Sequence, residues 1–497
     1  MRRGLSLGVV ALVAVSLLGA LTPAAEAEPP GLLTGFSDDA AYRQESPANR
    51  GLAFARTREA GGSVVRLFIE WAQIAPTRPP TTRDARNPAW SGYVWGRLDA
   101  VVQEAKSAGL EPVLGFYDSP SWAEGPGRPA VSENIPAGTW LPSASAFRSF
   151  AEAAARRYSG SLADPAVAGG TLPRVRYWQV WNEPNLTNYL TPQWRRRGDS
   201  YDPLSPVTYR RLLNAFFDGV KAVDQSNFVV TAGTAPYGDL RRGDRRMPPA
   251  LFTRELLCVK GQSGPKAVRC PGGPVRFDAL AHHPYPIGPP TRRARNPDDV
   301  VFADFAKLTV PLGVALKAGN VYPRRPKQIW ATEFSYDSSP PDPDGAPGMR
   351  QALYLESAFY LLWRQGVDVA VWFLMRDMAP DPDYASTLQS GVFFRGETIA
   401  QDRRKPSYTA FRFPFTAFRV KGRRVELWGL APRPGRVTIE QLKAGRWTSI
   451  MRLSTGTGRV FVGSRRLKNG SLVRARLGSE TSLTWRVYRG AQYPPPR

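Results

Sequence analysis

Short apolar strands alternate with amphipathic helical stretches along most of this 497-residue chain, and this alternation constrains the fold more than any other feature. It occurs eight times, without the fixed-period repeat that a solenoid requires. Eight strands with helices between them predict an α/β protein with a (β/α)8 TIM barrel. We expect the first strand to end near residue 36 and the others to cover residues 63–70, 112–117, 174–181, 228–233, 276–281, 328–332 and 367–374.

The pattern changes near residue 417, where short alternating strands replace the strand-helix pairs. Asn469-Gly470 lies between two of these strands and predicts a tight hairpin turn. The tail therefore predicts a small C-terminal all-β sandwich domain over residues 418–497, after a barrel domain over residues 28–417. We expect the sandwich to buttress the barrel, and glycan binding is the alternative role.

The N-terminus has the order of segments that is typical of a secretory signal peptide. Arg2 and Arg3 precede an uncharged run over residues 5–21, and small residues follow up to Ala27. We expect residues 1–27 to be a cleaved signal peptide. No second apolar span follows, so we expect a secreted, extracellular protein without stable membrane insertion after cleavage.

The cysteines agree with export. Cys258 and Cys270 are the only two, and both lie in one polar, Gly-rich segment. We expect them to form a disulfide bond that closes a short loop in an oxidising compartment. With only two histidines besides, a Cys/His zinc site is not expected, although a calcium ion bound by carboxylates stays open.

The chain is strongly basic, with 67 Lys and Arg against 42 Asp and Glu and a net charge of +25. Such a charge suits an anionic partner, for example an acidic polysaccharide. The alternative is a compositional bias, because the arginines are scattered in pairs and triplets along the chain. No nucleic-acid-binding motif or basic helix accompanies the charge, so no nucleic acid partner is expected.

Two glutamates each lie at the expected C-terminal end of a strand. Glu183 follows the fourth strand within Asn182-Glu183-Pro184, and Glu333 ends the seventh. In a parallel barrel both would project into one cleft. A retaining glycosidase needs two such groups about 5–5.5 Å apart. One must stay protonated, with its pKa raised by burial and by the charge of the other carboxylate, and Arg66 on the second strand could keep the other ionised.

The segment from Trp181 to Pro184, followed by Thr332-Glu333, resembles the clan A (β/α)8-barrel glycoside hydrolases. It is most similar to family 39 and to the cellulase-like family 5, and the resemblance covers residues 35–415. It implies that Glu183 is the general acid/base and Glu333 the nucleophile. It also implies that Asn182 bonds the 2-hydroxyl group of the sugar, a contact that strengthens in the transition state.

Further residues match positions that contact the sugar or the nucleophile in that clan. Only one of His282 and His283 can face the cleft, and the spacing to Tyr285 favours His283. A structural ion pair is the alternative role for Arg66, and packing in the core is the alternative role for Tyr285 and Trp372. The expected substrate-binding residues are Arg66, Asn182, His283, Tyr285, Trp372 and Trp122.

Together these features predict a secreted retaining glycoside hydrolase that cleaves β-type O-glycosidic bonds in a poly- or oligosaccharide by double displacement. The resemblance implies no metal or organic cofactor. A transglycosylase would use the same residues and pass the sugar to an acceptor other than water. A catalytically silent carbohydrate-binding protein on the same fold is the alternative from a different class.

Overall fold

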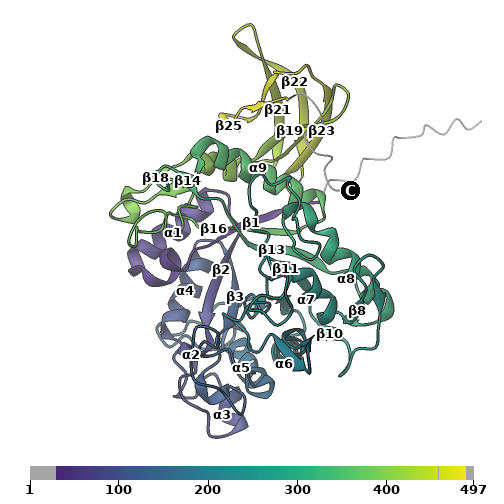
Figure 1. Ribbon diagram of the computed structural model, residues 1–497. Helices are drawn as coiled ribbons and strands as arrows, with labels where there is room; N and C mark the ends of the chain where they lie inside the picture. Colours follow the sequence, from purple (N-terminus) through teal and green to yellow (C-terminus); the bar gives the residue numbers. More distant parts are fainter. Residues whose placement is uncertain (1–29, 457, 489–497) are drawn as a thin grey trace, which may run out of the picture.

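The computed structural model describes residues 30–456 and 458–488, so the expected signal peptide lies outside the described residues. Eight parallel strands close a barrel in the order β1-β16-β13-β11-β7-β4-β3-β2 (Figure 1). This confirms the predicted TIM barrel. Its strands are β1 (Leu33–Ser37), β2 (Val64–Glu70), β3 (Glu111–Tyr117), β4 (Tyr177–Val180), β7 (Phe228–Thr231), β11 (Ala279–His282), β13 (Gln328–Phe334) and β16 (Val369–Phe373).

Helices surround the barrel, and local sequence sets their ends. The Ser46 and Ser143 side chains accept hydrogen bonds from backbone N–H groups of the first turns of α1 and α5. Gly319, in the left-handed conformation, ends α8. The main helices are α1 (Pro47–Glu59), α4 (Gly96–Ser107), α5 (Ala144–Arg157), α6 (Ser205–Val223), α7 (Pro249–Leu256), α8 (Ala306–Ala318), α9 (Gly348–Arg364) and α10 (Pro406–Arg412).

The apolar core has two layers because alternate residues of each strand point to opposite sides of the sheet. A small cluster fills the barrel and includes Val64, Val113, Trp330 and Val371. A much larger cluster lies between the strands and the helices. Toward the C-terminal ends of the strands, the inner positions become polar, beginning with Arg66 on β2.

The expected sixth strand is divided into two pieces. β10 (Val275–Arg276) pairs with β12 (Val321–Tyr322) outside the barrel, and only β11 belongs to the barrel. Between them, the buried Asp278 carboxylate accepts a hydrogen bond from the Val229 N–H at 3.0 Å and pairs with Lys221 at 2.9 Å. The prediction of one continuous strand was wrong because apolar content alone does not reveal this interruption.

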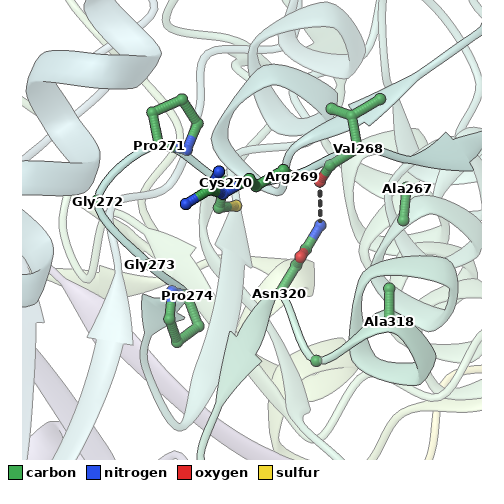
Figure 2. Close-up of a pocket in the computed structure, with 11 residues that line it drawn as sticks. Ala267, Val268, Arg269, Cys270, Pro271, Gly272, Gly273, Pro274, Ala318 and Asn320 are labelled. Carbon is green, nitrogen blue, oxygen red and sulfur yellow. Dashed lines mark hydrogen bonds between the residues drawn. The ribbon is translucent and has the colours of Figure 1, made fainter.

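The expected disulfide bond between Cys258 and Cys270 is present. It lies near β10 and β12, which precede barrel strands, so it lies on the side of the barrel opposite to the C-terminal ends of the strands. A hollow of about 680 Å³ lies beside it (Figure 2). There the Asn320 side chain donates a hydrogen bond to the Val268 carbonyl at 2.9 Å.

The C-terminal region forms two antiparallel sheets, in agreement with the predicted β-sandwich. One sheet has the order β19-β20-β23, and the other has the order β22-β21-β24-β25 with β26 paired to β24. The strands are β19 (Phe415–Lys421), β20 (Arg424–Leu430), β21 (Gly435–Lys443), β22 (Arg446–Thr455), β23 (Val460–Arg466), β24 (Leu472–Leu477), β25 (Glu480–Thr481) and β26 (Trp485–Arg486).

This β domain packs on helix α9 of the barrel (Figure 1). The Tyr360 ring stacks on Phe418 at 4.7 Å, and its hydroxyl group donates to Glu426 at 2.7 Å. The predicted hairpin at Asn469-Gly470 was wrong. The strands on either side of it, β23 and β24, belong to different sheets, so the turn connects the sheets instead of pairing its own flanking strands.

No helix within residues 30–456 and 458–488 is long and apolar enough to cross a membrane.

Candidate active site

Both glutamates lie around one histidine at the C-terminal end of the barrel. His283 Nδ1 is 2.9 Å from Glu183 Oε1 and 3.9 Å from Glu333 Oε2. The two carboxylate oxygens therefore cannot be further apart than the sum of these distances. This limit on one pair of oxygens is compatible with the separation of about 5–5.5 Å between carboxyl groups that is typical of retaining glycosidases.

Glu333 receives one hydrogen bond at each oxygen. Arg66 Nη1 donates to Oε2 at 2.8 Å, and the Tyr285 hydroxyl donates to Oε1 at 2.7 Å. Burial, and then the negative charge of Glu333, raises the pKa of Tyr285 well above its usual value, so the phenol stays protonated and remains a donor. A guanidinium and a phenol donor together stabilise a negative charge on Glu333.

Arg66 is itself fixed by two further hydrogen bonds. Its Nε donates to Gln179 Oε1 at 2.6 Å, and its Nη2 donates to Asn182 Oδ1 at 2.9 Å. Only 1% of its side chain is exposed. Because the Asn182 oxygen is occupied by Arg66, the amide nitrogen of Asn182 is the atom that can donate to a ligand.

Glu183 has the properties of a group that stays protonated. Burial raises its pKa from 4.5 to about 7, and the nearby positive charge of Arg66 opposes this rise. The sequence led us to expect a contribution from the second carboxylate, but burial is the cause that raises the pKa. The Glu183 side chain is still 14% exposed, so a ligand can reach it.

His283 stays neutral beside Glu183. Burial lowers its pKa to about 3, although the charge of Glu333 opposes this effect. Its Nε2 lies 3.1 Å from the Thr332 hydroxyl, which holds the ring in place. A neutral imidazole adds no positive charge beside Glu183, and its contact orients the carboxyl group.

His282 points elsewhere. Its Nδ1 lies 2.8 Å from the Thr234 hydroxyl and its Nε2 lies 2.9 Å from the Val300 carbonyl. Strand alternation therefore separates the two adjacent histidines, with His283 on the side of the carboxylates.

Two predicted sugar contacts do not lie at this site. Trp372 is fully buried, packs against Phe334 on the helix side of β16, and donates to the Ser390 carbonyl at 2.8 Å. Its neighbour Phe373 occupies the inner position that follows Val371. The prediction that Trp372 binds the substrate was wrong because this residue points out of the barrel.

Trp122 lies at a separate hollow of about 410 Å³, formed with residues 78–82 and 143–150. Its ring meets Trp71 edge-on, and its Nε1 donates to the Ala75 carbonyl at 2.9 Å. These contacts are structural, since both the ring edge and the only donor of the side chain are engaged within the loop.

The sequence reasoning missed two polar residues of the site, Gln179 and Tyr189. Gln179 Nε2 donates to the Thr332 hydroxyl at 3.1 Å, while its oxygen accepts from Arg66. Tyr189 lies near both carboxylates, whose charges add to burial in raising its pKa, and its hydroxyl bonds the Asn182 side chain. Gln179 could have been found as a polar residue inside an apolar strand, but no local signal marks Tyr189.

Further carboxylates lie beside Arg66 at the ends of β1 and β2. Arg43 bridges Asp39 and Glu70 at 3.2 and 3.1 Å, and the Tyr117 hydroxyl donates to Glu70 at 3.0 Å. Burial raises the pKa of Asp39 to about 6, although the charges of Arg43 and Arg66 oppose this rise. Carboxylate oxygens accept hydrogen bonds from hydroxyl groups and repel other carboxylates.

The described residues contain no group of three or more His, Cys, Asp or Glu side chains that could hold a metal ion.

Comparison with known proteins supports the predicted fold. No model of a known protein family matches the sequence, and no curated protein sequence matches it. The structure is similar to a family 39 glycoside hydrolase from the gut symbiont Bacteroides cellulosilyticus WH2, with a TM-score of 0.53 and 16% identity over 88% of this chain and 79% of the other. At this identity the likeness shows the fold alone, a (β/α)8 barrel.

Two other solved structures are similar at lower scores. A family 39 β-xylosidase from Caulobacter crescentus has a TM-score of 0.47 and 15% identity over 90% of this chain and 97% of the other. A family 5, subfamily 18 protein from Streptomyces cattleya, solved in complex with GlcNAc, has a TM-score of 0.43 and 14% identity over 78% of this chain and 79% of the other.

Proposed function

We propose that this chain is a retaining O-glycoside hydrolase that cleaves β-type bonds in a poly- or oligosaccharide. The observation that carries the proposal is the pair of unlike carboxyl groups around neutral His283. Glu183 has a raised pKa, whereas Glu333 receives hydrogen bonds from Arg66 and Tyr285. When the surroundings favour the protonated form of one carboxyl group and the ionised form of the other, the first can act as the acid and the second as the nucleophile.

In the first step, the Glu333 carboxylate attacks the anomeric carbon while Glu183 gives its proton to the departing glycosidic oxygen. A covalent glycosyl-enzyme forms and the aglycone leaves with the proton. In the second step, the Glu183 carboxylate removes a proton from water, which attacks the same carbon and releases Glu333. The Asn182 amide nitrogen would donate to the 2-hydroxyl group, and this bond would strengthen as positive charge develops on the ring.

For the sugar beside Arg66, we infer an uncharged ring with free hydroxyl groups. Asp39 and Glu70 would accept hydrogen bonds from hydroxyl groups there. Together with Glu333 they outnumber the two guanidinium groups that pair with them, those of Arg43 and Arg66, so the remaining negative charge would repel a uronic acid. An acidic sugar unit is therefore disfavoured at this position, although the chain as a whole is positively charged.

More distant sugar units have a candidate site in the segment after Glu183. There, β5 (Trp194–Arg197) and β6 (Ser200–Pro203) form a hairpin. A hollow of about 630 Å³ lies beside it, with aromatic side chains in its lining: Trp140, Trp194 and Tyr201. Aromatic rings with a polar edge suit the flat faces of sugar rings. Export of the protein, expected from its N-terminus, would bring this site to extracellular polysaccharides.

The test is hydrolysis of a panel of neutral and acidic polysaccharides by the wild type, with Glu183→Ala and Glu333→Ala beside it. We expect cleavage of a neutral polymer, with both variants strongly impaired. Azide should rescue Glu333→Ala and give a glycosyl azide of inverted configuration, because azide then replaces the missing nucleophile. Products lengthened by transfer to a second sugar would reassign the protein as a transglycosylase. Binding of a glycan without cleavage by any form would contradict the catalytic assignment.

A further inference from the structure

The positive charge of this protein is concentrated in its β domain. Residues 415–488 contain 16 Lys and Arg but only 3 Glu and no Asp, whereas residues 30–414 contain 47 Lys and Arg and 37 Asp and Glu. The 74-residue domain thus contributes a charge of +13, against +10 for the far larger barrel. A uniform compositional bias does not produce such a difference, so the charge of the domain needs its own explanation.

The three glutamates of the domain are all engaged away from its exposed cations. Glu426 pairs with Arg364 of helix α9 and accepts from Tyr360, and Glu480 pairs with Arg412 of helix α10. Glu440 pairs with two arginines of β24, Arg474 and Arg476. No carboxylate of residues 415–488 is therefore left to neutralise the remaining cations.

Three of these cations form a row across the sheet β19-β20-β23. Lys421 on β19 lies opposite Arg424 on β20, and Arg424 lies opposite Arg466 on β23. All three are exposed, and residues directly opposite each other share one face of a sheet. Neighbouring strands are about 4.8 Å apart, so the row spans about 10 Å, which suits several charged groups of a polymer better than one small ion.

A purely structural role does not account for this row. Charged side chains often protect the edge strands of sheets, and this reading suits Arg466 on β23. Arg424, however, lies on the central strand, and like charges placed directly opposite each other destabilise a sheet. The arrangement therefore lowers the stability of the free domain and becomes favourable when an anionic partner neutralises it.

A hollow of about 480 Å³ adjoins the row. Lys421 and Arg423 line it from the turn between β19 and β20, and Lys468 lines it from the turn after β23. Arg419 forms its base: the residue is 6% exposed, and it donates to the Gly422 carbonyl of the first turn at 2.5 Å and to Asn469 Oδ1 of the second at 2.6 Å. The hollow is thus a fixed feature with cationic walls.

We propose that this cationic face, formed by Lys421, Arg423, Arg424, Arg466 and Lys468, binds an anionic polysaccharide through its carboxylate or sulfate groups. Among residues 30–456 and 458–488, no aromatic side chain lines the hollow, whereas proteins that bind single-stranded nucleic acids stack the bases on aromatic rings. The partner is distinct from the neutral sugar inferred for the barrel. The β domain would thereby hold the protein on an acidic glycan while the barrel acts on another.

The test measures binding of the whole protein to polygalacturonate, to dextran sulfate and to neutral dextran. The variant Lys421→Glu/Arg424→Glu/Arg466→Glu should bind both anionic polymers at least tenfold more weakly than the wild type at low salt. The matched control Arg433→Glu/Arg436→Glu/Arg452→Glu makes the same change of charge at exposed positions outside this face, in or beside β21 and β22. It should lose less than threefold.

Salt dependence gives a second readout. If three ion pairs form, a rise from 50 to 200 mM NaCl should weaken wild-type binding by about 20- to 40-fold, by analogy with counterion release from nucleic acids. Tighter binding of polygalacturonate would identify carboxylate groups as the ligands, and tighter binding of dextran sulfate would identify sulfate groups. The neutral variant Lys421→Gln/Arg424→Gln/Arg466→Gln guards against misfolding, because removing like-charge repulsion should leave its Tm at or above that of the wild type.

Equal losses in the variant and its matched control would show that net charge alone attracts the polymer, and would overturn the proposal. Tighter binding of duplex DNA than of either polysaccharide, lost in the same variant, would also overturn it in favour of a nucleic acid partner. Binding is measured without turnover, so an inactive barrel would not affect the outcome.

Discussion

The raised pKa of Glu183 predicts the alkaline side of the pH profile. A rise from 4.5 to about 7 in a side chain that is only 14% exposed corresponds to roughly 3 kcal/mol in favour of the protonated form. At pH 7 about half of the molecules then carry the proton, compared with about one in 300 for a group that titrates at 4.5. Each further pH unit should lower kcat/KM about tenfold.

The assay compares two substrates of the same sugar over pH 5–9. A substrate with an alkyl leaving group needs the proton of Glu183, so its kcat/KM should fall above pH 7. A dinitrophenyl glycoside needs no proton for departure, and the first chemical step should show no such fall. Glu183→Gln should remove the fall for the alkyl glycoside and slow this substrate by about 10²- to 10⁴-fold.

The pH dependence of stability gives an independent test of the raised pKa of Glu183. Between pH 4.5 and about 7 the unfolded chain has lost the Glu183 proton while the folded protein retains it, so this group lowers stability as the pH rises. Glu183→Gln cannot ionise and should therefore have a higher Tm than the wild type at pH 8, with little difference at pH 4. A fall in kcat/KM centred near pH 4.5, or one that persists in Glu183→Gln, would refute the reasoning.

The remaining predictions concern the nucleophile, the buried tryptophan and the disulfide bond. Tyr285→Phe removes a hydrogen bond to the Glu333 carboxylate, which is worth about 1.5–3 kcal/mol. It should lower kcat about 10- to 150-fold for activated and unactivated glycosides alike. The decisive measurement is kcat for the dinitrophenyl substrate. Trp372→Phe should lower the free energy of unfolding in denaturant titrations while leaving KM unchanged, because the ring lies in the helix-side core; a raised KM would contradict this position. Cys258→Ser/Cys270→Ser opens a loop with a sequence separation of 12 and should cost about 3 kcal/mol at most, with activity intact below the lowered Tm.

The fold was predictable because the apolar pattern alternates along most of the chain and each strand lies within a few residues of its expected position. At the site, Arg66, Asn182, His283 and Tyr285 were placed by motif, and the structure brings all four to the two glutamates. Their roles still depend on the experiments above.

Other residues could not be placed because the local pattern contains no information about direction. All five residues of β16 are apolar, so nothing in the sequence tells which of Trp372 and Phe373 points into the barrel. Tyr189 reaches the site from a loop, where no periodicity applies. Asn469-Gly470 has the composition of a hairpin turn, but the pairing of its flanking strands depends on distant partners.

The least predictable feature is the position of consecutive polar residues in one site, since successive residues of a strand point to opposite faces. After β4, two residues adopt positive φ angles that break this alternation. Trp181 at φ 71° turns its ring toward Phe147 of helix α5. Glu183 at φ 32° brings its carboxyl group to the same side as Asn182. Each such conformation costs roughly 1–3 kcal/mol and is maintained by the surrounding packing.

On β13 the solution is a bulge. Ala331 pairs with Ala370 and Phe334 with Trp372, so β13 contains one residue more than its partner between these pairs. Thr332 can therefore contact His283 while the next residue, Glu333, contacts Arg66, and Phe334 returns to the helix-side core. The positions of both carboxyl groups thus depend on local departures from strand geometry. Strand periodicity alone therefore locates the C-terminal end of the barrel but does not predict the direction in which each glutamate side chain points.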